Sequence, residues 1–214
     1  MNAFVTGTDT DAGKTYFTIL LVKALRAAGI DAVGMKPIAC GDNPDTGHLV
    51  AAADGVVTAE EINPVWLRTP ASPFTASVVE NRMIDIDLIL EKYRRLRANH
   101  ASVIAEGVGG WMVPICPDYY VADLAETMAL PIILVVDNKL GALNHALLTL
   151  ENIQKRGLEC LGVVFNNRSA AEDIAARTNR SILETLAPVP ILCELARDQE
   201  TLELDAFGAR AAAG

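Results

Sequence analysis

The chain has 214 residues, of which 51% are hydrophobic, and carries a formal net charge of −9. This length and apolar content predict one domain, spanning residues 1–214, with a sizeable core. The acidic balance argues against nucleic acid or an anionic membrane surface as the main partner, because both need clustered lysine and arginine.

No feature of the sequence predicts secretion or membrane insertion. The four cysteines (Cys40, Cys116, Cys160 and Cys193) have neither the spacing of a zinc site nor that of a disulfide framework. The N-terminus lacks the basic and apolar regions of a signal peptide, and no apolar run approaches the ~20 residues of a membrane helix. We therefore expect a cytoplasmic protein.

Short apolar runs of strand length alternate with segments of helical period. The predicted strands cover residues 3–6, 32–35, 102–105, 132–136, 161–165 and 189–192, and the clearest helical patterns cover residues 17–28, 86–93 and 143–153. The run at 132–136 is apolar on both faces, which is typical of a parallel strand covered by helices on both sides. The pattern predicts an α/β fold with three αβα layers and a doubly wound, mostly parallel sheet, with ligands at the carboxyl ends of its strands.

The first predicted strand runs into the stretch VTGTDTDAGKT, which nearly matches a phosphate-binding loop. Gly13, Lys14 and Thr15 fit the end of that motif, but Gly7 stands one residue too early and Thr8 takes its place. Helix N-termini favour anions, so we expect Lys14 to reach the outer phosphates and Thr15 to ligate magnesium. The early glycine implies either an extra loop residue or a Thr8 backbone in the conformation usually given to glycine.

A simpler alternative for this stretch is a capped turn without a ligand. In that case Asp9, Thr10 or Asp11 would accept hydrogen bonds from the N–H groups of the following helix. The position after the first strand favours phosphate binding instead, because α/β sheets bind phosphates there.

Lys36 follows the second predicted strand and is expected to lie beside the first loop. There its charge could stabilise a transferring phosphoryl group, whereas the alternative is an ordinary solvated lysine. The polar segment 41–73 predicts an excursion before the next helix. One of its aspartates, Asp42, Asp45 or Asp54, could ligate a metal, although most such aspartates form turns.

Glu106 closes the apolar strand predicted at residues 102–105. An acidic residue in this place is the Walker-B arrangement, in which a carboxylate holds Mg²⁺ next to the loop threonine. The Gly-x-Gly-Gly that follows would let the backbone approach a phosphate or substrate closely, or would simply form a turn. The three histidines (His48, His100 and His145) have no spacing that predicts a metal site or a nucleophilic triad.

Several of these motifs together resemble the dethiobiotin synthetase family, whose fold is P-loop NTPase-like. The most specific are GTDTDAGKT, EGVGGW and ILVVDNKLGALNH, and KPIACG, PASP and VVFNN extend the similarity over most of the chain. The family's loop has the form GTxTxxGKT, so the early glycine is the family's own variant. The resemblance implies an ATP- and magnesium-dependent ligase of biotin biosynthesis.

The chemistry that this resemblance implies needs no protein nucleophile. One amine of 7,8-diaminononanoate takes up CO₂ as a carbamate, ATP phosphorylates the carbamate, and the second amine closes the ring of dethiobiotin. Positioning and electrostatic stabilisation are then the protein's tasks. The family also implies a homodimer in which the start of one subunit's helix at residues 140–144 holds the carboxylate of the other subunit's substrate.

The resemblance also implies a set of site residues. The carbamate and γ-phosphate would lie among Thr10, Lys14 and Lys36, and the magnesium ligands would be Thr15, Asp45 and Glu106. Nucleotide contacts would come from Asp11, Ala12, Gly13, Lys14, Thr15, Glu106, Gly107, Gly109, Asn166, Leu195, Ala196 and Arg197. Substrate contacts would come from Thr10, Lys36, Cys40, Gly109, Leu140, Gly141, Ala142, Leu143 and Asn144.

Three details accompany this set. Asn166 would bind the adenine base, with Asn167 as the fallback, because an amide can pair with both a donor and an acceptor. The family usually has serine at the position of Cys40, which would replace a hydroxyl contact with a thiol contact. Asp45 is chosen over the other aspartates because Asn43-x-Asp45 before an apolar helical stretch resembles the family's pattern.

Two other functions are compatible with parts of the pattern. A ParA/MinD-like ATPase switch would carry an additional lysine near the loop's start, where Thr8 and Asp9 stand here, and would need a DNA- or membrane-binding surface. A cobyrinate-type amide-forming synthetase would normally add a glutaminase domain, for which 214 residues leave no room. We also expect the alanine-rich tail at residues 206–214 to be frayed or disordered.

Overall fold

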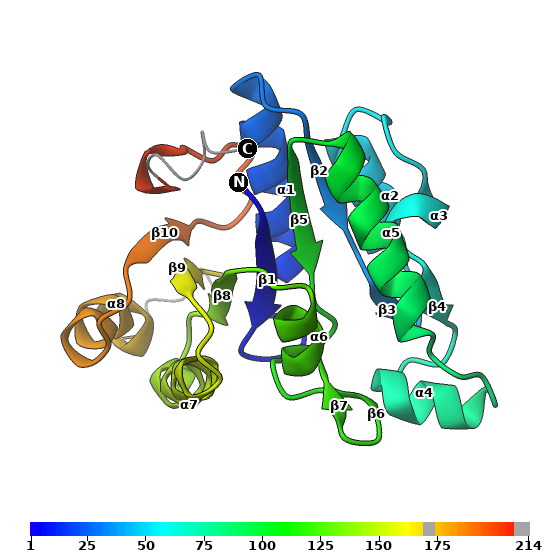
Figure 1. The fold of residues 1–214 in the computed structure, drawn as a ribbon. Coiled ribbons are helices and arrows are strands. Elements are labelled where there is room, and N and C mark those ends of the chain that lie inside the picture. Colours follow the sequence, from blue (N-terminus) through cyan, green and yellow to red (C-terminus); the bar gives the residue numbers. More distant parts are fainter. Residues whose placement is uncertain (169–173, 208–214) are drawn as a thin grey trace.

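The computed structural model describes residues 1–168 and 174–207. Its main sheet has six parallel strands in the order β10-β9-β8-β1-β5-β2, so β1 lies in the interior of the sheet (Figure 1). The bounds of these strands are β1 Ala3–Gly7, β2 Ala32–Met35, β5 Ser102–Glu106, β8 Ile132–Asp137, β9 Cys160–Asn166 and β10 Ile191–Leu195. The predicted α/β class with a doubly wound parallel sheet is confirmed.

Helices cover both faces of this sheet (Figure 1). On one face α1 (Lys14–Ala27) packs beside α2 (Pro44–Ala52), and the opposite face carries α5 (Ile86–Asn99), α6 (Val121–Thr127), α7 (Ala142–Lys155) and α8 (Ile174–Leu186). The remaining helical elements are α3 (Ala59–Ile62), α4 (Pro73–Val79) and the 3-10 helix η1 (Asp205–Phe207). None of the described helices is long and apolar enough to cross a membrane.

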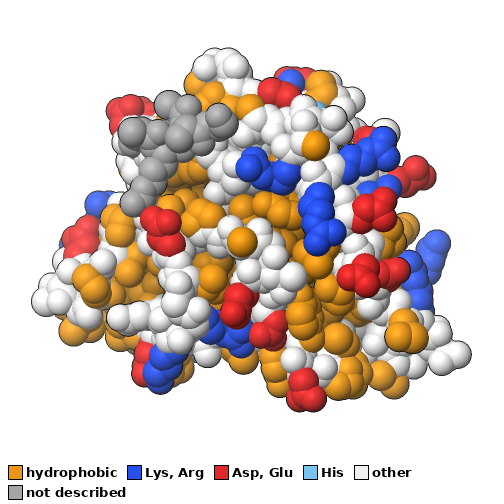
Figure 2. Space-filling model, viewed as in Figure 1, with side chains coloured by type: hydrophobic (Ala, Val, Ile, Leu, Met, Phe, Trp, Pro, Cys, Tyr) orange, Lys and Arg blue, Asp and Glu red, His pale blue; other side chains and the backbone are white. Residues whose placement is uncertain are grey.

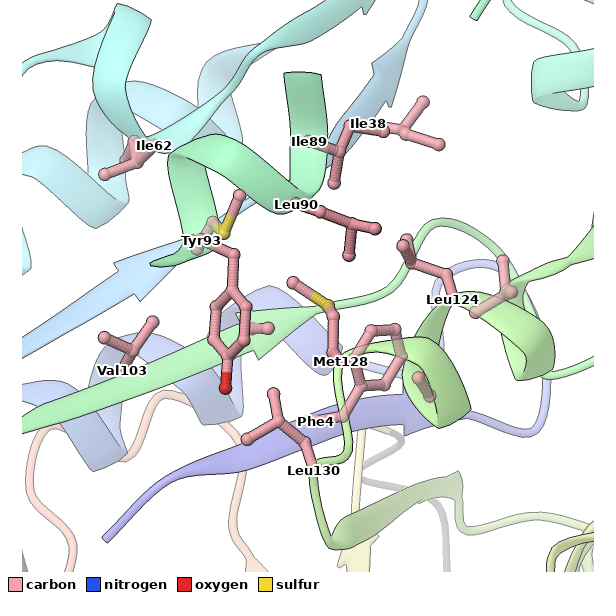
Figure 3. Close-up of a cluster of buried hydrophobic side chains, with 14 of the residues drawn as sticks. Phe4, Ile38, Ile62, Ile89, Leu90, Tyr93, Val103, Leu124, Met128 and Leu130 are labelled. Atoms are coloured by element: carbon pink, nitrogen blue, oxygen red, sulfur yellow. The ribbon is translucent and has the colours of Figure 1, made fainter. Parts of the chain in front are cut away.

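The alternation of side chains along β1 shows why both faces need cover. Val5 packs with Phe17 and Leu21 of α1, whereas Phe4 belongs to the core on the other face. Figure 3 shows Phe4 in that second core beside Leu130, with Tyr93 of α5 nearby. Burying each large apolar side chain stabilises the fold by about 1.5–3 kcal/mol, so the two cores hold the central strand rigidly beneath the loop that follows it.

The segment at residues 41–73 is more regular than its composition suggests. It contains α2, α3 and the strand β4 (Val65–Leu67), which pairs with β3 (Ile38–Cys40) in a separate two-stranded parallel sheet. A second small sheet joins β6 (Pro114–Cys116) and β7 (Tyr119–Tyr120) after the glycine-rich turn. These small sheets lie beyond the carboxyl ends of β2 and β5.

Two predicted boundaries are wrong. The last strand runs from Ile191 to Leu195 rather than over residues 189–192, because its pairing with β9 extends to that strand's end at Asn166. The tail was predicted to be frayed from residue 206, but Phe207 is buried and its ring stacks on Phe17 with the centroids 6.2 Å apart. Residues 208–214 of that tail lie outside the described residues.

Candidate active site

The phosphate-binding loop joins β1 to α1. Among the described residues of this loop, positive φ angles fall on Asp11 (58°) and Gly13 (99°), so the alternative of a glycine-like backbone at Thr8 is wrong. Gly13 is the N-cap of α1 and supplies no side-chain cap, while the Asp9 carboxylate accepts a hydrogen bond from the N–H of Thr10 within the loop. The N–H groups of the first helical turn therefore receive no cap from Gly13, as an anion site requires.

Asn166, at the carboxyl end of β9, supports this loop from the side. Its Nδ2 donates a hydrogen bond to the carbonyl oxygen of Ala12 at 3.0 Å. A Cβ atom added to Gly13 would lie 1.9 Å from the same Nδ2. A side chain at residue 13 would therefore clash with Asn166. This position needs glycine for packing as well as for its positive φ.

Lys36 lies between two carboxylates at one end of the loop. Its Nζ atom is 2.5 Å from Oε1 of Glu106 and 2.9 Å from Oδ2 of Asp45. The Thr15 hydroxyl donates to the same Glu106 oxygen at 2.6 Å. Because the exposed fractions of the Lys36 and Glu106 side chains are 7% and 0%, this ion pair is shielded from water.

The oxygen atoms of this cluster suit a divalent cation. Magnesium prefers oxygen ligands, and here a hydroxyl from Thr15 and carboxylates from Asp45 and Glu106 converge. The second carboxylate oxygen of Glu106, Oε2, is buried and has no hydrogen-bond partner among the described residues. Buried carboxylate oxygens are seldom left unpaired, so the residues present here fit a divalent cation.

Of the three candidate aspartates, Asp54 does not belong to this cluster. Its Oδ2 accepts from Nε of Arg26 at 2.8 Å, in an exposed ion pair away from the loop. Asp42 lines the cleft described below, and Asp45 contacts Lys36 directly. The geometry therefore favours Asp45 as the third oxygen ligand.

The surroundings shift the pKa values of the two buried lysines in opposite directions. Burial and then the charge of Lys36 lower the pKa of Lys14 to about 8. Burial would also lower the pKa of Lys36, but the neighbouring Glu106 and Asp45 carboxylates outweigh burial and raise it. Burial would likewise raise the pKa of Asp45, yet the Lys36 charge lowers it below its usual range. Lys36 is thus held as a cation, whereas Lys14 needs a bound anion to hold its proton firmly above pH 8.

A cleft of about 990 Å³ runs along the carboxyl ends of the strands and contains this cluster. At one end it is lined by Lys36, Cys40 and Asp45, and at the other end by Asn166 and Arg197. Thr10, Asp11, Gly13, Lys14, Thr15, Glu106 and Gly109 also line it. The cleft lining thus comes from both sides of the loop, from the ends of β2 and β5 on one side and of β9 and β10 on the other.

Comparison with known proteins shows the family to which this chain belongs. The model of a family described as an AAA domain matches residues 2–203. An ATP-dependent dethiobiotin synthetase BioD from Akkermansia muciniphila is 50% identical over 204 residues, which cover 95% of this chain and 96% of that relative. The chain belongs to the ATP-dependent dethiobiotin synthetase family. A family member from Anaeromyxobacter dehalogenans (strain 2CP-1) is 39% identical over 93% of this chain and 94% of its own.

Solved structures with low sequence identity share the fold of this dethiobiotin synthetase family member. The septum site-determining protein MinD from Pyrococcus horikoshii, complexed with Mg-ADP, has a TM-score of 0.59 at 17% identity and covers 92% of this chain and 82% of its own. A ParA family ATPase from Chlorobium tepidum has a TM-score of 0.54 at 12% identity and covers 99% and 89%. At these identities the likeness concerns the fold, and the sequence relatives decide the family.

Some residues that the dethiobiotin synthetase resemblance implied do not line the cleft. The side chains of Ala12 and Leu195 are buried in the core, and Gly107 packs against Phe4 and Val121. The carbonyl of Ala196 faces the Tyr16 hydroxyl instead. The group at the start of α7 is also absent from the described lining residues (Leu140, Gly141, Ala142, Leu143 and Asn144).

Other residues line the cleft although the sequence analysis did not predict them. Tyr16, Asn138 and Asp198 are the clearest, and the others are Ala39, Asn43, Pro44, Val108, Asp137, Lys139 and Arg168. For Asn138 a signal existed, because it follows an apolar strand at the same sheet edge as Lys36 and Glu106. Tyr16 directly follows the loop residue Thr15, which was a local signal as well. Asp198 gave none, since its place in the cleft depends on how the chain after β10 folds back.

Proposed function

We propose that this chain catalyses the ATP-dependent closure of 7,8-diaminononanoate and CO₂ to dethiobiotin, in biotin biosynthesis. One substrate amine attacks CO₂ to form a carbamate, whose oxygen then takes the γ-phosphoryl group of ATP with release of ADP. The second amine attacks the carbamoyl carbon, and phosphate leaves as the ring closes. The observation that carries this proposal is the buried Lys36 cation beside the phosphate-binding loop, in a chain 50% identical to a dethiobiotin synthetase.

Lys14, Lys36 and Thr10 are the residues that would surround the reacting groups. Lys14 starts α1 and would stabilise the outer phosphates, and a bound phosphate would in turn favour its protonated form. Lys36 remains charged and would lie against the carbamate and the transferring phosphoryl group, where negative charge is shared. Thr10 borders the same cleft and would hydrogen-bond the carbamate.

Thr15, Asp45 and Glu106 would hold a magnesium ion bound with ATP. When bound, this ion would neutralise charge on the β- and γ-phosphates. The oxygen donor set and the unpaired Oε2 of Glu106 support this assignment. The structural neighbour MinD from Pyrococcus horikoshii is described as a complex with Mg-ADP, which supports the same cofactor on this fold.

The proposed reaction uses no protein nucleophile, because both nucleophiles belong to the substrate. Cys40 is the thiol that lines the cleft, and burial raises its pKa to about 11, so it stays protonated. A protonated thiol can still hydrogen-bond weakly to the substrate, which is the role we propose for Cys40. Asn166 and Arg197 would contact the adenine end of ATP at the opposite end of the cleft.

ATP hydrolysis by the purified protein is expected to require both 7,8-diaminononanoate and bicarbonate. The physical reason is that the acceptor of the phosphoryl group exists only after the diamine has taken up CO₂. Phosphate release should be measured with each substrate omitted in turn, and the product should be identified by mass spectrometry. Release at the same rate without the diamine would refute the synthetase and favour an ATPase switch.

The start of α7 is proposed to serve a neighbouring subunit in a homodimer. Gly141 is the N-cap of this helix, and no side chain caps its first turn, which suits a carboxylate. Figure 2 shows hydrophobic side chains reaching the surface on the face that carries α7. Leu140 and Leu148, with exposed fractions of 81% and 59%, are candidates for the dimer contact.

Sedimentation velocity is expected to give a mass of about twice 22.9 kDa at micromolar concentration. Leu148→Glu should shift the protein toward the monomer, because it would place a charge in an apolar contact. The matched exchange Leu186→Glu, at an exposed leucine on α8, should leave the mass unchanged. A wild-type protein that stays monomeric at all concentrations would contradict the shared site.

A further inference from the structure

Tyr16 joins the phosphate-binding helix to a distant segment of the chain. It follows Lys14 and Thr15 in the first turn of α1. Its hydroxyl donates to the carbonyl oxygen of Gln199 at 2.6 Å and lies 3.2 Å from the carbonyl oxygen of Ala196. Both acceptors belong to the segment at residues 196–199 that leaves β10.

Hydrogen bonds of the Gln199 side chain also stabilise this segment. The Gln199 side chain accepts from the N–H of Ala196 at 3.0 Å and donates to the carbonyl oxygen of Thr201 at 2.7 Å. Between these anchors, Arg197 and Asp198 line the cleft, as Tyr16 itself does. The segment is therefore one wall of the cleft, and the Tyr16 hydroxyl is its bond to the phosphate-binding helix.

The order of the strands indicates which part of a nucleotide this wall would face. The loop follows β1 in the interior of the sheet, and the Lys36–Glu106 cluster lies toward β5 and β2. The segment at 196–199 follows β10, at the opposite edge. A nucleotide whose outer phosphates point to Lys36 must direct its base toward residues 196–199.

We propose that Tyr16 is a positioning residue. Its hydroxyl fixes the position of the segment at residues 196–199, against which the nucleotide base would lie. This inference rests on the proposed function in one respect, namely that the ligand is a nucleoside triphosphate. Through this hydrogen bond, residues 196–199 stay at a fixed distance from the first turn of α1, which would bind the phosphates. Tyr16 thereby contributes to affinity for the base and to discrimination between bases, and not to affinity for the phosphates.

The test compares a nucleotide with a ligand that has no base. Titration calorimetry should show that Tyr16→Phe weakens binding of Mg·ATP about fivefold to tenfold, the usual range for one lost hydrogen bond. Binding of Mg·tripolyphosphate should stay unchanged, and the preference for ATP over GTP should shrink. In steady-state assays KM for ATP should rise while kcat stays near the wild-type value.

Two further variants make the result specific. Gln199→Ala removes the other anchor of the same segment and should give the same pattern as Tyr16→Phe. Tyr119→Phe removes a tyrosine hydroxyl that bonds Thr127 at 3.0 Å, away from the cleft, and should change neither ligand's affinity.

Two outcomes would overturn the inference. Equal weakening of ATP and tripolyphosphate would mean that Tyr16 acts on the phosphate loop. Unchanged ATP affinity in both Tyr16→Phe and Gln199→Ala would mean that the wall does not contact the base. Failure of the proposed synthetase would appear separately, as normal ATP binding without formation of dethiobiotin.

Discussion

Lys36→Ala is expected to lower kcat by at least about 10²–10³-fold while leaving the affinity for Mg·ATP largely intact. Lys36 is buried and lies beside the loop, so its charge would act where we propose that the phosphoryl group is transferred. Binding of the nucleotide itself is expected to depend mainly on the loop N–H groups and on Lys14. Single-turnover rates and calorimetric titrations of the variant check these two expectations separately.

The same substitution should also lower the free energy of unfolding. Without Lys36, Glu106 keeps a buried carboxylate without its cation, and breaking such a pair typically costs about 3–5 kcal/mol. Urea unfolding of Lys36→Ala should therefore show a lower free energy of unfolding in the absence of ligand, and a smaller deficit when Mg·ATP supplies a new cation to Glu106. Lys155→Ala is the matched control, because this lysine pairs with Glu151 at the surface.

A different outcome would reassign Lys36. If ATP affinity collapses together with turnover, Lys36 binds the nucleotide in its ground state and does not act selectively on the transferring group. If neither kcat nor stability changes, the ion pair with Glu106 has no role in the reaction.

Glu106→Gln is expected to weaken magnesium binding in the ternary complex by about 10²-fold or more, since it would remove the buried carboxylate that we propose as a ligand of the ion. The measured quantity is the Mg²⁺ concentration that gives half-maximal activity at saturating ATP. Direct Mn²⁺ binding to the ATP complex, followed by electron paramagnetic resonance, gives a second readout that does not depend on turnover. Both should shift in the same direction.

The aspartates supply the controls for this prediction. Asp45→Asn should raise the Mg²⁺ requirement as well, because Asp45 belongs to the same cluster as Thr15 and Glu106. Asp54→Asn should leave the requirement unchanged, since Asp54 pairs with Arg26 at the surface. A shift in Asp54→Asn, or none in Glu106→Gln, would contradict the proposed ligand set.

Much of the fold was predictable because its strands are short, apolar and evenly spaced between amphipathic helices. The long helices α1, α5 and α7 show the helical period clearly, since each buries one broad face. α8 was not predicted, although its sequence is strongly amphipathic and Leu183 packs in the core cluster that also contains residues of α7.

The sequence by itself predicted a phosphate-binding loop and determined which family its motifs resemble. Those features are local: a glycine-rich loop between a strand and a helix needs few residues, all neighbours along the chain. The tertiary structure decided which distant groups meet there. Lys36 and Glu106 are 70 residues apart in sequence, and Tyr16 and Gln199 are 183 apart.

The choice of Asp45 over Asp54, and the place of positive φ at Asp11 instead of Thr8, were decided by the same packing. Contacts over such separations form only because parallel strands bring their carboxyl ends to one edge of the sheet. Which side chains meet at that edge depends on strand order, and strand order is a property of the folded chain.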